Sequence, residues 1–192
     1  MTYYHVISGL KKPETLIEFE GQGRVARLFN YFISNSNDGK FLKYTTPVGI
    51  AQEDMRESDL EKLDYLDAVI GIPIFSERFV ETLGSLLAQE AEFHPAEIIC
   101  KRKTKTFYLT RIIRFEEWID RDKSDYVTLD DGVKILSSTN VVTKNVQSEF
   151  YLARDTVHTN WVASEKLKRL AEQYKMNMVF YEHKPMKSWC AE

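Results

Sequence analysis

The sequence predicts an α+β fold with a mostly antiparallel sheet, and three observations support this prediction. Short segments of alternating apolar and polar residues, typical of strands, recur along the chain. Two longer segments have apolar residues at helical spacing, and a serine stands directly before each of them. Strands and helices follow no regular βαβ order, which argues against a parallel sheet. We therefore expect two serine-capped amphipathic helices packed against the sheet.

The N-terminal portion, residues 1–67, contains strand-like and helix-like segments, and we expect it to be integral to the same fold as a core over 68–192. The residues between 51 and 67 are acidic, and their apolar positions fit one or two short helices. Strands are predicted over 3–7, 15–20 and 41–46, and an amphipathic helix is predicted over 24–33.

In the core portion, alternation and helical spacing predict a longer series of elements. A β-hairpin is expected around a polar turn at 103–105, and a charged connection follows it at 118–126. The remaining elements are a strand or extended segment over 68–75, a helix over 77–90, strands over 133–136 and 149–154, a helix from about 165 and a strand over 176–183.

Ser76 and Ser164 stand at equivalent positions, each directly before Glu and a helical apolar stripe. A serine oxygen at this position can accept a free N–H of the first helical turn. A nucleophile elbow would need glycines at 74 and 78, and the chain has Ile74 and Arg78 there. Both serines are therefore predicted to cap helices and to have no catalytic role.

Composition narrows the class of protein. The chain has 192 residues, 43% of them hydrophobic, and a formal net charge of −3. It is therefore expected to be globular, and it lacks the basic footprint of a general nucleic-acid binder. Cys100 and Cys190 make no disulfide framework, which fits a reducing compartment. Without a recognisable signal peptide or an apolar run that could span a bilayer, we expect a soluble, cytoplasmic protein.

Two weak motifs keep an enzymatic alternative open. Residues 21–26 match G-x-G-x-x-A, which in a dinucleotide fold brings Gly21 and Gly23 against a pyrophosphate. The polar–apolar alternation of the strand before them favours a tight turn instead. The aspartates between Asp120 and Asp131 suggest a calcium loop, yet its sixth position is Asp125 instead of glycine. The alternative function is a small nucleotide- or cation-binding enzyme that uses these glycines and this loop. No zinc-ligand spacing is present, and no cofactor is predicted.

Charge is distributed in blocks along the chain. Residues 53–97 contain twelve acidic and three basic side chains, and 116–131 contain seven acidic and two basic ones. Such blocks are typical either of solvated faces or of a surface that steers a positively charged partner. The basic run at 101–105 falls at the predicted hairpin turn, where lysines protect an edge or, alternatively, contact nucleic acid.

Three segments in order carry a resemblance to a known family: VIGIPIFSERFVETL from 69, YLTRIIRFEEWIDRDKSDY from 108, and EFYLARDTVHTNWVASEKLKRLAEQYKMNMVFYEH from 149. This arrangement resembles a family of bacterial polymorphic-toxin immunity proteins of myxobacterial type, first described as a domain of unknown function. It covers about two-thirds of the chain. The usual glycine near the last strand is absent, and Asn177 stands in that region.

The resemblance implies a non-enzymatic inhibitor that binds a cognate toxin, encoded by a neighbouring gene and in many cases a nuclease, and covers its active site or substrate-binding surface. It implies no cofactor, no membrane partner and no direct contact with nucleic acid. The family provides no binding motif, so the contact residues are a hypothesis from charge density and loop position with two aromatic anchors. They are Glu116, Glu117, Trp118, Asp120, Asp122, Asp125 and Tyr126.

Overall fold

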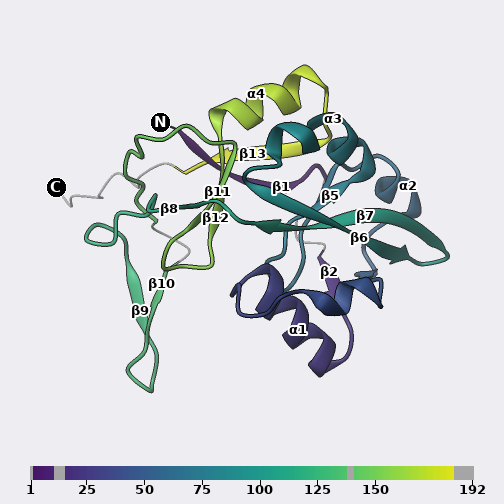
Figure 1. Cartoon of the computed structure of the whole chain (residues 1–192), viewed down its shortest axis with the longest axis horizontal. Helices are drawn as coiled ribbons and strands as arrows, with labels where there is room; N and C mark the ends of the chain where they lie inside the picture. Colours follow the sequence, from purple (N-terminus) through teal and green to yellow (C-terminus); the bar gives the residue numbers. More distant parts are fainter. Residues whose placement is uncertain (1, 11–15, 138–140, 184–192) are drawn as a thin grey trace.

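The computed structural model describes residues 2–10, 16–137 and 141–183, and within them the chain forms two large sheets, a separate hairpin and four α-helices (Figure 1). The predicted α+β class is confirmed. Both large sheets are mixed, because each contains one parallel pair of strands among antiparallel ones. None of the helices in these ranges is long and apolar enough to cross a lipid bilayer.

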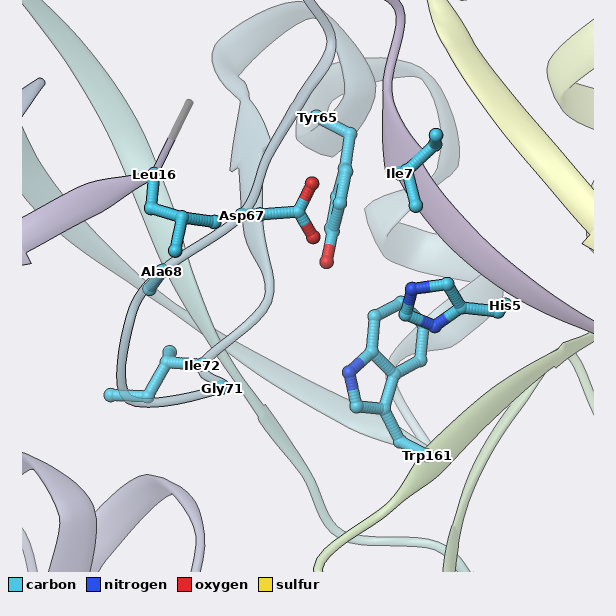
Figure 2. A pocket seen from close by; sticks show the side chains of 9 residues that line it. All are labelled: His5, Ile7, Leu16, Tyr65, Asp67, Ala68, Gly71, Ile72 and Trp161. Carbon is cyan, nitrogen blue, oxygen red and sulfur yellow. The ribbon is translucent and has the colours of Figure 1, made fainter. Parts of the chain in front are cut away.

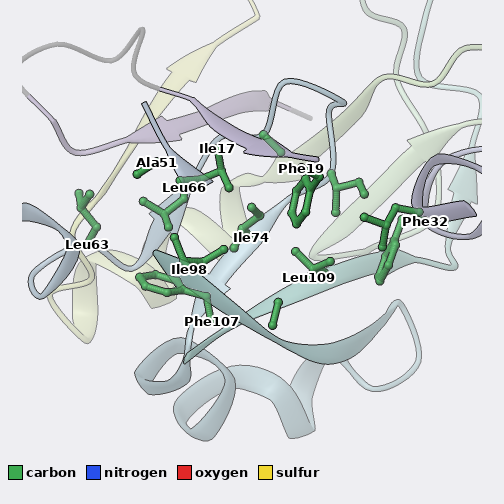
Figure 3. Packing of buried hydrophobic residues seen from close by; sticks show 14 of the residues in the cluster. Ile17, Phe19, Phe32, Ala51, Leu63, Leu66, Ile74, Ile98, Phe107 and Leu109 are labelled. Carbon is green, nitrogen blue, oxygen red and sulfur yellow. The ribbon is translucent and has the colours of Figure 1, made fainter. Parts of the chain in front are cut away.

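The six-stranded sheet is curled, and its two ends meet. Ile17 at one end donates its N–H to the Asp67 carbonyl at 2.7 Å, and Val69 donates to the Ile17 carbonyl at 3.0 Å. The curl encloses one side of the sheet, where Ile17, Ile74 and Ile98 are fully buried (Figure 3). The strand order is β2 (Ile17–Phe19), β3 (Val48–Ala51), β6 (Ala91–Cys100), β7 (Lys103–Ile112), β5 (Ile74–Ser76) and β4 (Tyr65–Leu66).

The five-stranded sheet has apolar residues on both faces, because successive side chains of a strand point to opposite sides. Val162 faces Trp118 and Phe150, whereas its neighbour Ala163 packs in the cluster that contains helix residues Phe79 and Leu167. The strand order is β13 (Met178–Glu182), β1 (Tyr3–Ser8), β12 (Trp161–Ser164), β11 (Leu152–Asp155) and β8 (Phe115–Glu116).

Helices cover the sheets from two sides. In Figure 1, α3 and α4 lie together on one side of the molecule and α1 lies on the other. Residues 1–67 contribute β1 to the five-stranded sheet and β2 to β4 to the curled one. The helices are α1 (Gln22–Phe32), α2 (Glu57–Leu60), α3 (Glu77–Leu87) and α4 (Glu165–Gln173), with a short 3₁₀ helix η1 (Lys40–Lys43).

Two local predictions are wrong. The predicted strand over 41–46 is instead η1 and the turn after it, entered through Gly39 in the left-handed region at φ 67°. The hairpin turn lies at Lys101 and Arg102 instead of 103–105, and Lys101 adopts a φ of 56° without being glycine. A positive φ at lysine is uncommon, so the sequence contains no signal for that turn position.

Candidate functional site

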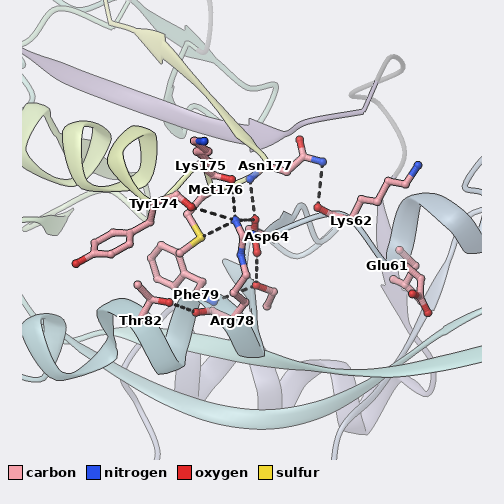
Figure 4. A network of polar contacts seen from close by, with 12 residues as sticks. Glu61, Lys62, Asp64, Arg78, Phe79, Thr82, Tyr174, Lys175, Met176 and Asn177 are labelled. Carbon is pink, nitrogen blue, oxygen red and sulfur yellow. Dashed lines mark hydrogen bonds and ion pairs between the residues drawn. The ribbon is translucent and has the colours of Figure 1, made fainter.

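Ser76 is a helix cap within a buried polar network. Its oxygen accepts the Phe79 N–H at 3.1 Å, and its hydroxyl donates to Asp64 at 2.6 Å. Asp64 also accepts the Asn177 N–H at 2.7 Å and a guanidinium N–H of Arg78 at 2.9 Å (Figure 4). Ser76 and Asp64 are both buried, so this carboxylate links α3 to the connection between α4 and β13.

The network confirms a structural role for Ser76. Its hydroxyl proton is already donated to a carboxylate, and no histidine is among its described contacts. The Arg78 guanidinium donates to Asp64 and to the Lys175 carbonyl, the latter at 2.7 Å. Ser164 is the second cap and accepts the Leu167 N–H at 3.4 Å.

The structure around Gly21 and Gly23 differs from the strand–turn–helix unit of a dinucleotide-binding fold. Gly21 precedes α1 with φ 83°, and its carbonyl accepts the first helical N–H groups. A Cβ added at Gly23 would meet no atom within 4 Å, so no close packing requires that glycine. The preceding β2 pairs antiparallel with β3, whereas a Rossmann strand is parallel to its neighbours. Figure 1 also shows α1 well separated from β9 (Tyr126–Thr128), which follows the 120–125 aspartates.

The basic hairpin contacts the acidic α2 region. The backbone N–H of Arg102 donates to the Glu57 carboxylate at 3.0 Å, and the Lys103 ammonium forms an ion pair with Glu61. The Lys105 ammonium donates to the Glu61 carbonyl at 3.0 Å. Lys103 is thereby paired, whereas the Arg102 side chain is 96% exposed.

A second polar cluster fixes α1 on the β6–β7 hairpin, and the sequence contained no signal for it. The Tyr31 hydroxyl lies 3.0 Å from both Glu92 and His94, and Arg111 contacts Glu92 at 3.1 Å. The Arg111 guanidinium also lies over the Tyr31 ring at 4.4 Å. Arg111 and Glu92 pair their charges within the cluster, and burial of the Tyr31 hydroxyl raises its pKa.

Several of the carboxylates proposed as partner contacts are already paired. Glu116 accepts hydrogen bonds from Arg114 and from Ser148, the latter at 2.6 Å. A hydrogen bond from Lys144 at 2.8 Å lowers the pKa of Glu117, and Lys123 lowers that of Asp120 in the same way. Asp122 and Asp125 are exposed. The loop is therefore less negative than its carboxylates alone indicate, because Arg114 and Lys123 pair with them locally and Lys144, distant in sequence, folds onto Glu117.

The two aromatic residues of that hypothesis are structural. Trp118 is fully buried beside Tyr3, with ring centroids 6.3 Å apart, so its assignment as a surface anchor is wrong. Tyr126 is half-buried, and its hydroxyl lies 3.2 Å from His158. Trp118 therefore packs in the core beneath the loop, and Tyr126 contacts His158 at the start of the strand that follows the loop.

That strand belongs to a hairpin of β9 (Tyr126–Thr128) and β10 (Lys134–Leu136), which projects from the body of the molecule (Figure 1). Val127 pairs with Ile135, and Leu129 donates its N–H to the Val133 carbonyl at 2.8 Å. Alternation places these four side chains on one face. Their exposed fractions are 50% for Val127, 46% for Ile135, 44% for Leu129 and 51% for Val133. We call these four residues the aliphatic strip.

Two acidic residues lie at the turn beside the aliphatic strip. Asp130 and Asp131 form the turn with Gly132 at φ 83°, and the strands contain Lys134 as their one cation. The aliphatic strip and these two aspartates are absent from the contact residues predicted from sequence. Asp-Gly between alternating aliphatic residues is a hairpin signal that would have indicated the element.

The part of the chain that the structure describes contains no group of three or more His, Cys, Asp or Glu side chains arranged to hold a metal ion. The calcium interpretation of the aspartate loop thus has no supporting geometry. No protein-family model matches this chain, and no curated protein matches it either.

Proposed function

We propose that this protein is an immunity protein that binds a cognate bacterial toxin in the cytoplasm and neutralises it by covering its active or substrate-binding surface. The observation that carries the proposal is the projecting β9–β10 hairpin, whose aliphatic strip faces solvent. Contiguous exposed apolar side chains on a soluble domain are typical of interaction sites. The family resemblance in the sequence supports the same conclusion.

The hairpin has the properties of a recognition element. A two-stranded hairpin is marginally stable alone in water, and this one belongs to neither large sheet. Its outer strand edges leave backbone N–H and C=O groups for pairing with another chain. A partner that covers the aliphatic strip would remove its four side chains from water and order the hairpin at the same time.

The charge of the residues in and before the hairpin indicates the charge of the partner. Between residues 122 and 136, four exposed aspartates stand against two lysines: Asp122, Asp125, Asp130 and Asp131 against Lys123 and Lys134. Such a rim favours a positively charged partner and raises its association rate. A nuclease presents a basic cleft for phosphates, and the aspartates could occupy it. The contact surface we propose is therefore the aliphatic strip with these four aspartates, without Trp118.

The test is complex formation with the product of the neighbouring reading frame. We expect the two proteins to copurify, and the double substitution Val127→Thr with Ile135→Thr to weaken the complex at least about tenfold. The matched control is Val69→Thr with Ile50→Thr, which makes the same changes at residues that are 54% and 37% exposed outside the hairpin. Equal loss in both variants, or no complex, would contradict the proposal.

A further inference from the structure

A cavity of about 310 Å³ opens between the two large sheets. His5 and Ile7 of β1 and Trp161 of β12 line one side, and the chain from Tyr65 to Ile72 lines the other (Figure 2). The floor of the cavity consists of buried residues, namely Tyr65, Ile72 and Trp161. Its mouth is formed by the exposed residues His5 and Gly71. No lining residue belongs to the β9–β10 hairpin.

One carboxylate defines the polarity of this cavity. Asp67 accepts the Ser8 N–H at 3.1 Å and a hydrogen bond from the Tyr65 hydroxyl. Burial raises the pKa of Asp67, and His5 is the one described side chain whose charge opposes this. Although part of the His5 side chain is exposed, desolvation of its ring by the surrounding protein lowers the pKa of His5, so that ring is largely neutral near pH 7. Asp67 thus has hydrogen-bond donors but no lysine or arginine partner among the described residues.

Aromatic and aliphatic side chains form the rest of the wall. The rings of Tyr65 and Trp161 lie 6.0 Å apart at 57°, and Figure 2 shows both turned toward the same space as the Asp67 carboxylate. The faces of such rings attract cations, and guanidinium groups stack on them. Ile7 and Ile72 supply surface for an alkyl chain.

This combination selects one class of ligand. An anion would meet the Asp67 carboxylate, and a purely apolar ligand would desolvate that carboxylate without compensating it. A metal ion would find too few ligand groups among the described residues. A compact organic cation satisfies both the carboxylate and the aromatic faces, and the volume is at the small end of ligand pockets.

We propose that the cavity bounded by Tyr65, Asp67 and Trp161 binds an alkylguanidinium or alkylammonium group, with the charge on Asp67 and the alkyl chain along Ile7 and Ile72. The group belongs to a free small molecule or to an arginine or lysine side chain of another protein. The site does not depend on the proposed immunity function, because it uses other residues on other elements.

The experiment is a titration of the full-length protein with n-butylguanidinium and its neutral isostere n-butylurea, followed by NMR. The Ser8 amide is the reporter, because it donates to Asp67. We expect saturable shifts with a Kd of about 1 mM for the cation and binding at least about tenfold weaker for the urea. Equal binding of both probes, or no saturable shift with the cation, would overturn the proposal without any substitution.

Variants locate the site. Asp67→Asn keeps an acceptor for the Ser8 N–H and should weaken cation binding at least about tenfold. The exposed control Asp122→Asn should leave the Kd unchanged, and loss in both variants would contradict the assignment. N-acetyl-arginine-N-methylamide then distinguishes the sources. If it binds like n-butylguanidinium, the natural ligand is a protein side chain, and if it does not bind, the ligand is a free cation.

Discussion

At the scale of single residues, Ser76 and Ser164 occur in the same sequence motif but make different numbers of hydrogen bonds. Both serines cap a helix, but only Ser76 also donates to a buried carboxylate, Asp64. That carboxylate lies 12 residues earlier in the chain, and its other donors come from Arg78 and Asn177. The sequence motif was sufficient to predict both caps, but the network depends on contacts distant in sequence.

This difference makes a quantitative prediction for alanine substitutions. Ser164→Ala loses one cap and should lower the free energy of unfolding by about 1 kcal/mol. Ser76→Ala also removes a donor from the buried Asp64, so its loss should be about 2–4 kcal/mol. Urea unfolding of the two variants measures both values. Equal losses would show that the Ser76–Asp64 hydrogen bond contributes nothing.

A second prediction concerns pH. Burial, with a smaller contribution from His5, lowers the pKa of His183 from 6.5 to about 4. The folded state therefore binds fewer protons than the unfolded state below pH 6.5, and the free energy of unfolding should fall as pH falls toward 4. The His183→Phe substitution keeps an aromatic ring beside Trp118, whose ring centroid lies 5.4 Å from that of His183. It should reduce the decrease in the free energy of unfolding between pH 6.5 and pH 4 by about 2 kcal/mol. Unfolding curves at several pH values test this, and identical slopes for both proteins would contradict it.

At the scale of elements, alternation and helical spacing identified most of the strands and the longer helices, and failed where the backbone takes unusual conformations. Lys101 at positive φ shifted the β6–β7 turn, and the segment after Gly39 became a 3₁₀ helix despite its strand-like composition. The parallel pairing of β3 with β6 joins segments distant in sequence, which no local pattern encodes. The pairing of Glu117 in the candidate contact loop was not predictable from local patterns either, since Lys144 reaches it only in the folded chain.

The β9–β10 hairpin should be separable from the rest of the fold. It forms its own two-stranded sheet, so replacing residues 127–135 by a two-glycine turn should change the free energy of unfolding by less than about 1 kcal/mol. The same variant should no longer bind the partner. Chemical unfolding and a binding assay of one protein preparation measure both effects. A collapse in stability would show that the hairpin supports the core.

At the scale of the whole molecule, some charged residues of the acidic and basic blocks pair with each other in the fold, and others remain exposed to solvent. Within the 101–105 run, Lys103 pairs with Glu61 and the Arg102 backbone N–H donates to Glu57 of α2, whereas the aspartates beside the aliphatic strip remain at the surface. Composition alone cannot separate these cases, because it contains no information on which side chains meet. The fold therefore reduces the candidate surface to the projecting hairpin and the loop before it.

The most direct test of this account is a survival count. Cells would express the product of the neighbouring reading frame from an inducible promoter, alone, with this protein, or with the hairpin variant Val127→Thr and Ile135→Thr. The account predicts death with the neighbouring product alone, full survival with the wild-type protein, and loss of protection with the variant at equal expression. Survival in all three cultures would contradict the immunity function, and full protection by the variant would contradict the role of the aliphatic strip.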